Sequence, residues 1–197
     1  MGKQKYLVFV NELFNKSPVV EFNSIDRLVN DKKQVKQYTK QLIRNLLLKG
    51  IIKNLTKGYY TKSDDTSLAV FCFKPSYLGL QDALSFHNLW EQETIPIIIT
   101  SRKVRQGIRE ISKNNVLIRR MDEKYFFGIE YYQHGEFYLP YSDIEKTFID
   151  MVYFKEKISE EVLSEILQKI DRRKLNSYLM HYPKKFRDID IPVDSGY

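Results

Sequence analysis

One segment, residues 33–49, constrains the fold of this chain more than any other. Asp31 followed by Gln34 matches a helix start with a capping box, and Lys49-Gly50 matches a helix end. Between these signals, residues that can be buried recur at helical spacing, at Val35, Thr39, Leu42, Ile43, Leu46 and Leu47. We therefore predict an amphipathic helix with one buried stripe.

The opposite face of this predicted helix carries only basic and amide side chains, and no acidic residue interrupts it. At about 100° per residue, Lys33, Gln37, Lys40 and Arg44 share that face, flanked by Gln34, Lys36 and Gln41. Lys and Arg bind phosphates and guanine, and Gln pairs with adenine. We predict that these seven residues contact DNA.

The neighbouring segments have the order of a winged helix-turn-helix. We predict helices over 6–14 and 25–29 with a short extended piece, 19–22, between them, and after the long helix a hairpin of strands 51–53 and 59–61 joined by 54–58. In such a domain the third helix enters the major groove and the hairpin lies along the neighbouring backbone. Lys53 and Lys57 are the predicted contacts of the hairpin. The predicted domain spans residues 1–62.

The charge of the chain supports this interpretation once it is divided along the sequence. The 197 residues include 32 Lys or Arg and 25 Asp or Glu, a net charge of +7. Residues 1–62 hold 13 Lys or Arg against 4 acids, a balance of +9, whereas the rest of the chain has a balance of −2. A basic module indicates nucleic acid or another anionic surface as its partner. A solvated basic surface or a protein-interaction module are the alternatives.

The remainder of the chain predicts an α/β domain over residues 68–197 that ends in helices, so that the whole chain is of the α+β class. The polar and acidic stretch 61–67 is the predicted joint. The expected strands are 68–73, 95–100, 116–119, 125–132 and 136–140, with a turn at 133–135, and the expected helices are 79–89, 143–152, 159–170 and 172–180. The stretch beyond Pro183 is expected to be extended over the surface.

Several of these segments resemble the AbiEi family of type IV antitoxins and their transcriptional-regulator relatives. The resemblance covers nearly the whole chain and depends on the order and spacing of five segments: Gly58-Tyr59-Tyr60, residues 77–89, Ile97-Ile98-Ile99-Thr100, Phe126-Phe127-Gly128-Ile129 and residues 144–150. Asn88 and Lys146 depart from the family pattern, in which Gly and Arg are usual.

The resemblance implies an N-terminal winged helix-turn-helix and a C-terminal antitoxin domain. It further implies an autorepressor that binds inverted repeats in double-stranded DNA upstream of its own operon, as a homodimer or as cooperative protomers. The implied functional partner is a nucleotidyltransferase-like toxin, with which no stable complex is expected.

The residues give little indication of an enzyme or of a cofactor. His87, His134 and His181 have no metal-ligand spacing to each other or to Cys72, and no phosphate-binding glycine loop occurs. Asp143, Lys146 and Asp150 share a helix face while Glu145 points elsewhere, which predicts an exposed ion-pair ladder or a capped helix start. A metal-dependent nuclease built on these acids is the remote alternative.

Two further groups of residues leave their roles open. Aromatic residues concentrate in and around 125–141, where a core or interface role is favoured over base stacking. Arg102, Lys103, Arg105 and Arg109 either extend a DNA footprint or belong to a solvated loop or helix, and the second interpretation is favoured.

The leading hypothesis is a cytoplasmic DNA-binding autorepressor and antitoxin that is not an enzyme and uses no metal or cofactor. The single cysteine, the short apolar start and the absence of a long apolar run are the grounds for expecting a cytoplasmic, non-membrane protein. The alternative is a winged-helix regulator whose C-terminal domain senses a ligand or a protein and has no antitoxin role.

Overall fold

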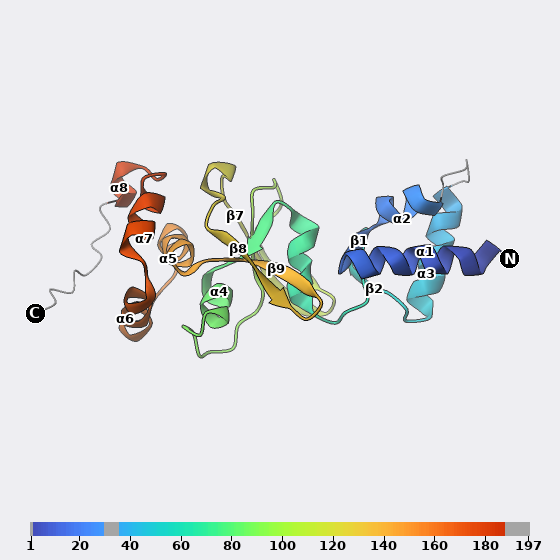
Figure 1. Cartoon of the computed structure of the whole chain (residues 1–197), viewed down its shortest axis with the longest axis horizontal. Coiled ribbons are helices and arrows are strands. Elements are labelled where there is room, and N and C mark those ends of the chain that lie inside the picture. Colours follow the sequence, from blue (N-terminus) through green and yellow to red (C-terminus); the bar gives the residue numbers. More distant parts are fainter. Residues whose placement is uncertain (1, 30–35, 188–197) are drawn as a thin grey trace, which may run out of the picture.

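The computed structural model describes residues 2–29 and 36–187, which form a mixed α+β fold. Figure 1 shows the N-terminal helices at one end of the molecule, a sheet in the middle and the last helices at the other end. No helix among these residues is long and apolar enough to cross a membrane.

The N-terminal part contains three helices and a small antiparallel sheet. The elements are α1 (Gly2–Lys16), β1 (Val19–Glu21), α2 (Phe22–Val29), α3 (Lys36–Leu48), β2 (Lys53–Thr56) and β3 (Tyr59–Thr61). Strand β3 lies between β1 and β2. The predicted helices and the extended piece at 19–22 are confirmed. The predicted cap at Asp31 and the stripe position Val35 lie outside the described residues.

The predicted hairpin is confirmed, but its first strand was placed too early. Strand β2 covers Lys53–Thr56 and not 51–53, so that most of the predicted connection is strand and only Lys57 and Gly58 form the turn. Ile52 is 1% exposed in the core of the three helices, because the chain is still folding back from α3 at this point. Gly58 supplies the positive φ of +82° that the turn requires.

The C-terminal part is built around a six-stranded mixed sheet. Its strands are β4 (Ser76–Leu78), β5 (Ile97–Thr100), β6 (Gly107–Ile111), β7 (Asn114–Arg120), β8 (Ile129–His134) and β9 (Phe137–Ser142), in the order β6-β7-β5-β4-β9-β8. The pairs β4/β9 and β5/β7 are parallel and the others antiparallel. The helical elements are η1 (Thr66–Phe73), α4 (Leu80–Phe86), η2 (Glu123–Tyr125), α5 (Ile144–Tyr153), α6 (Glu160–Lys169), α7 (Arg172–Leu179) and α8 (Lys184–Arg187).

The sheet separates two apolar cores. Ile97 and Ile99 face the core that contains residues of α5, α6 and α7, whereas Ile98 faces the core formed with η1. This alternation follows the two-residue period of a strand. The strands predicted at 95–100, 116–119 and 136–140 and the helices predicted over 79–89, 143–152, 159–170 and 172–180 are confirmed apart from their ends.

The prediction of a strand at 68–73 is wrong, because these residues form the 3₁₀ helix η1. A short apolar run does not distinguish a buried strand from a buried helical turn. The carboxylate of Asp65 accepts a hydrogen bond from the Ser67 backbone N–H at 2.9 Å, and this cap starts the helical turn. The strand predicted over 125–132 is also displaced, since residues 123–125 form η2 and β8 begins at Ile129.

Element η1 joins the two parts of the chain through a shared core. Val19 of β1 and Leu55 of β2 pack in the same cluster as Leu68, Val70 and Phe73 of η1. Leu55 reaches this cluster because the register shifts between Asn54 and Thr56 and leaves it as the extra residue of a bulge. The Ser112 hydroxyl, in the β6–β7 turn, also donates to the Asn54 carbonyl at 3.1 Å. The hairpin is therefore held against the C-terminal part.

Candidate nucleic-acid interface

Helix α3 presents the two faces that its sequence predicts. Thr39, Ile43 and Leu46 are at most 4% exposed and contribute to the N-terminal core. Lys40, Gln41 and Arg44 are exposed on the opposite side, where the Gln41 amide N–H donates to the Asn45 side-chain oxygen at 3.3 Å. No acidic residue occurs between Lys36 and Leu48.

The other predicted contacts on this helix are less fully described. Lys33 and Gln34 lie outside the described residues. Lys36 and Gln37 form the first turn of α3, but their side chains are likewise outside the description. Asn45, exposed one turn after Gln41, is an amide on this surface that sequence reasoning did not select, although its i+4 spacing was available as a signal.

The two lysines of the hairpin differ in their surroundings. Lys57 is exposed in the turn, at the tip of the hairpin. Lys53 lies at the opposite end of β2, where its ammonium forms an ion pair with Asp64. A lysine that already has a carboxylate partner is less available to a phosphate, so the geometry favours Lys57 over Lys53 as a backbone contact.

The acid–base group of α5 is buried, and the expectation of an exposed ion-pair ladder is wrong. Lys146 and Asp150 are both 0% exposed and form an ion pair with each other. The other Asp150 oxygen accepts a hydrogen bond from the Tyr77 hydroxyl at 2.7 Å, and the Lys146 ammonium also lies 3.3 Å from the Tyr182 hydroxyl. Burial arises because α5 lies between the sheet and α7, with apolar residues on its remaining faces.

The alternative expectation, a capped helix start, is confirmed at Asp143. Its Oδ1 accepts from the Lys146 backbone N–H at 2.7 Å, and its Oδ2 accepts from the Tyr178 hydroxyl at 2.8 Å. Glu145 does not point away from this group, because the Lys174 ammonium lies 3.1 Å from Asp143 and 3.2 Å from Glu145. The acids of α5 are thus used to bind α7.

Burial controls the pKa values in this group. Desolvation raises the pKa of Asp150, although the Lys146 ammonium opposes the rise, and desolvation lowers the pKa of Lys146 against the attraction of Asp150. Desolvation, followed by the Asp150 charge, holds the pKa of Tyr77 well above its ordinary value. Tyr77 and Lys146 both donate to the Asp150 carboxylate, and these buried interactions stabilise the packing of α5.

Several histidine and aromatic side chains contribute to the packing and hydrogen bonding of the fold. His87 Nε2 lies 2.8 Å from the Ser142 carbonyl. Tyr125 is buried and Phe126 and Phe127 are partly buried, whereas Tyr131 and Tyr138 are 67% and 57% exposed. Within the described ranges, no group of three or more His, Cys, Asp or Glu residues is arranged to hold a metal ion.

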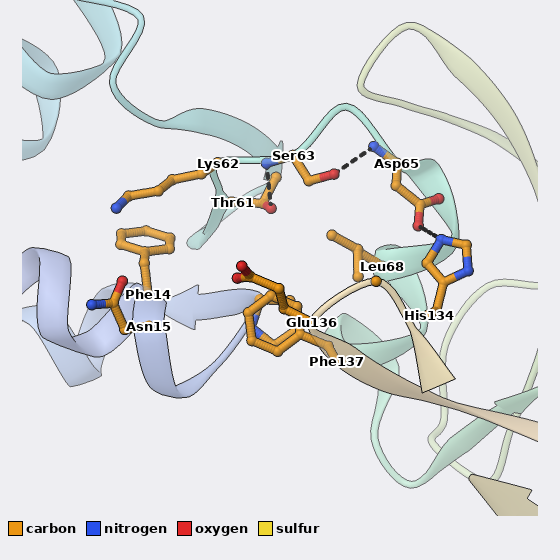
Figure 2. A pocket seen from close by; sticks show the side chains of 12 residues that line it. Phe14, Asn15, Thr61, Lys62, Ser63, Asp65, Leu68, His134, Glu136 and Phe137 are labelled. Carbon is orange, nitrogen blue, oxygen red and sulfur yellow. Dashed lines mark hydrogen bonds and ion pairs between the residues drawn. The ribbon is translucent and has the colours of Figure 1, made fainter. Parts of the chain in front are cut away.

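A pocket of about 530 Å³ lies between the N-terminal helices and the β8–β9 turn (Figure 2). Phe14 and Lys62 line it from the N-terminal part, and Glu136 and Phe137 line it from the C-terminal part. At its edge, His134 Nε2 lies 2.9 Å from a carboxylate oxygen of Asp65. Sequence reasoning did not predict this pocket, since its walls come from segments far apart in the chain.

Comparisons with known proteins identify the fold alone. No protein-family model matches the chain, and no curated protein matches its sequence. Among solved structures, the chain is similar to the crystal structure of the RV2827C protein from Mycobacterium tuberculosis, with 11% sequence identity and a TM-score of 0.56. The similarity covers 92% of this chain and 73% of that one.

Proposed function

We propose that this chain is a sequence-specific DNA-binding autorepressor whose N-terminal residues 1–62 act as a winged helix-turn-helix. One observation carries the proposal: α3 exposes Lys40, Gln41 and Arg44 on a face with no acidic residue, while its other face is buried. A major groove accepts a helix of this kind, and its residues can contact both phosphates and base edges. The order of three helices followed by a hairpin with Lys57 in its turn supports the same assignment.

The antitoxin part of the proposal rests on the resemblance to the AbiEi family. In this proposal the cytoplasmic repressor binds inverted repeats upstream of its own operon. Its C-terminal domain counters a nucleotidyltransferase-like toxin without forming a stable complex with it. The compact sheet and its covering helices provide a folded unit that is separate from the α3 surface.

The DNA-binding part is tested by removing two cations from α3. We expect the double variant Lys40→Ala/Arg44→Ala to bind a duplex from upstream of its own gene roughly 10- to 100-fold more weakly. The slope of log affinity against log salt should fall by about two, because each lost phosphate contact releases about one counterion fewer. Fluorescence anisotropy across a salt series measures both quantities.

The matched control removes the same charge elsewhere. Lys157 and Lys184 are exposed in the C-terminal part, so Lys157→Ala/Lys184→Ala should retain the affinity and the salt slope of the natural protein. Equal affinity of the α3 variant and this control would refute the assignment of α3.

The antitoxin part is tested by co-expression with the neighbouring reading frame. We expect the natural chain to relieve growth arrest caused by that frame, and the α3 double variant to relieve it equally when both are expressed from a foreign promoter. Continued arrest, with DNA binding intact, would refute the antitoxin role and retain the repressor.

A second candidate function, a ligand-sensing regulator, is favoured by the pocket between the two parts of the chain. Its volume is within the range of small-molecule sites, about 300–1,000 Å³, and such sites often lie between domains. Phe14 and Phe137 supply apolar walls, and Lys62 and Glu136 supply opposite charges. A ligand here would contact both the N-terminal and the C-terminal part of the chain.

This candidate is tested by filling the pocket. Ser63 lines it and is exposed, so Ser63→Trp should occupy the space without entering the core. If the pocket senses a ligand, low-molecular-weight cell extract should weaken DNA binding by the natural protein at least several-fold and leave the Ser63→Trp variant unaffected. An identical response of both proteins would contradict this function.

A further inference from the structure

Two opposite charges line the pocket of Figure 2 without pairing with each other. The Lys62 ammonium, from the N-terminal part, donates to the Asn11 side-chain oxygen at 3.0 Å and lies 5.5 Å from the centre of the Phe14 ring. Glu136, in the β8–β9 turn, is exposed, and it forms no ion pair with any residue that the structure describes. The pocket therefore offers one cation and one anion to a ligand.

The other carboxylate of the pocket is already used. One oxygen of Asp65 accepts a hydrogen bond from the Ser67 backbone N–H at the start of η1, and the other lies 2.9 Å from His134 Nε2. Figure 2 shows His134 and Asp65 at one edge of the pocket, away from Lys62. Lys62 and Glu136 are thus the charged groups that a ligand would meet.

Two hydroxyl groups line the pocket beside Lys62. Thr61 Oγ1 accepts from the Ser63 backbone N–H at 3.1 Å, and Ser63 Oγ accepts from the Asp65 backbone N–H at 3.1 Å. Each hydroxyl acts only as an acceptor in these bonds, so its own O–H group can still donate to a ligand. Residues 61–63 together offer an ammonium and two O–H donors, which are groups that bind a carboxylate.

Apolar side chains form much of the remaining lining. Phe14 and Leu68 are 5% and 3% exposed, and Phe137 is partly buried. These residues belong to α1, η1 and β9, so the apolar surface spans both parts of the chain. A ligand that fills the pocket would carry an apolar group in addition to its charges.

We propose that this pocket binds a free α-amino acid with an apolar side chain. The inference rests on the proposed ligand-sensing function and names the class of ligand. The carboxylate of the amino acid binds Lys62 and the hydroxyls of Thr61 and Ser63, and its ammonium binds Glu136. Its side chain lies against the apolar lining, next to Phe14. Because the two charged groups are joined through a single carbon atom, one small molecule bridges the cation and the anion of the pocket.

Other classes of small molecule match these charges less well. A nucleotide or another phosphorylated compound would be repelled by Glu136 and would find only one lysine, Lys62, in the lining. A simple amine would leave Lys62 without a partner, and a simple carboxylic acid would leave Glu136 without one. The charges of the lining therefore favour a zwitterion.

Isothermal titration calorimetry on the full chain tests the class of ligand. The probes are L-leucine, L-methionine and L-phenylalanine, followed by two analogues of the tightest of them, one without the amino group and one without the carboxylate. We expect at least one probe to bind with a Kd of about 1 mM or tighter. Both analogues should bind at least tenfold more weakly, because each loses a hydrogen-bonded charge. Absence of binding by all three probes, or equal affinity for the analogues, would overturn the proposal.

Two variants assign the charges to the two ends of the ligand. Glu136→Gln should weaken binding of the amino acid about tenfold and leave the affinity for the analogue without the amino group unchanged. Lys62→Met should show the converse, with unchanged affinity for the analogue without the carboxylate. Glu165→Gln, at an exposed position of α6, is the matched control and should bind every probe as the natural protein does. Natural affinity of Glu136→Gln for the amino acid would contradict the proposed site.

The sensing function and the class of ligand can fail separately. If an amino acid binds in the pocket but leaves the affinity for DNA unchanged, the inferred site stands and the sensing function fails. If none of the probes binds while the Ser63→Trp variant still loses the response to cell extract, the sensing function stands and this inference fails.

Discussion

Replacement of Lys146 by Met should lower the free energy of unfolding by about 3–5 kcal/mol, because it leaves the Asp150 carboxylate buried without its counter-charge. Both side chains are 0% exposed, so water cannot take the place of the lost ammonium. The Tyr77 hydroxyl would still donate to Asp150. Urea denaturation followed by circular dichroism measures the loss, with Lys157→Met as an exposed control.

A double variant shows whether stability is lost because the ion pair is absent or because a single charge remains buried. Lys146→Met/Asp150→Leu removes both charges and should recover most of the lost stability, since apolar replacement of a buried pair is often close to neutral. If the double variant were as unstable as Lys146→Met, packing and not charge would be the cause.

The pH dependence of the stability of Lys146→Met tests the same explanation, a buried carboxylate without its counter-charge. Burial already raises the pKa of Asp150 and the Lys146 ammonium opposes that rise, so removing the ammonium should raise the pKa further. An acid whose pKa is higher in the folded state favours folding at low pH and loses this contribution as the pH rises through the folded pKa. The free energy of unfolding that Lys146→Met loses relative to the natural protein should therefore be smaller at about pH 5 than at about pH 8.

Replacement of Gly128 by Ala should also destabilise the fold strongly, by about 2–4 kcal/mol from combined backbone strain and overpacking. Gly128 has a φ of +63°, and a Cβ added there would lie 2.8 Å from the Cβ of Lys146 and 2.8 Å from the Tyr178 ring. The new methyl group would push α5 and α7 away from the segment that leads into β8. The thermal unfolding midpoint should therefore fall clearly.

Gly135 provides the matched control for this substitution. Its φ of +61° is nearly the same, but nothing lies within 4 Å of the added Cβ. Gly135→Ala should therefore cost only the backbone part, about 1 kcal/mol. Equal losses at the two positions would show that the crowding at Gly128 has no energetic consequence.

The stability effects predicted above concern the acid–base group of α5. The sequence identified these charged residues, but it did not show that they are buried. The i, i+4 spacing of Lys146 and Asp150 places both on one side of a helix, whether that side faces water or protein. The structure buries this side against Tyr77 of the sheet and Tyr182 beyond α7. Asp143 and Glu145 then bind Lys174 of α7, a partner 29 residues from Glu145 in the numbering of the chain.

Elements with strong local patterns were predicted well. Helices α3 and α5 show apolar residues at helical spacing together with capping signals, and both occur where they were expected. The hairpin before α5 has a glycine in its turn and was also found. Short segments failed: β4 has only 3 residues, and η1 is an apolar run without a distinguishing period.

The candidate nucleic-acid interface was likewise predicted only in part. The exposed positions of Lys40, Gln41 and Arg44 follow from the helical period and were predicted. The ion pair that occupies Lys53 was not, because Asp64 lies beyond the hairpin and meets Lys53 only when β2 and β3 pair.

The positions where charge accumulates and the apolar face of α3 follow from the amino-acid sequence, because helical periodicity and net charge are properties of neighbouring residues. Which charges are paired, buried or exposed to a partner depends instead on tertiary packing. Burial and ion pairing depend on segments distant in the chain, such as α5 with β4 and α7, or η1 with β6. Their energies arise only when those segments come within a few ångströms of each other.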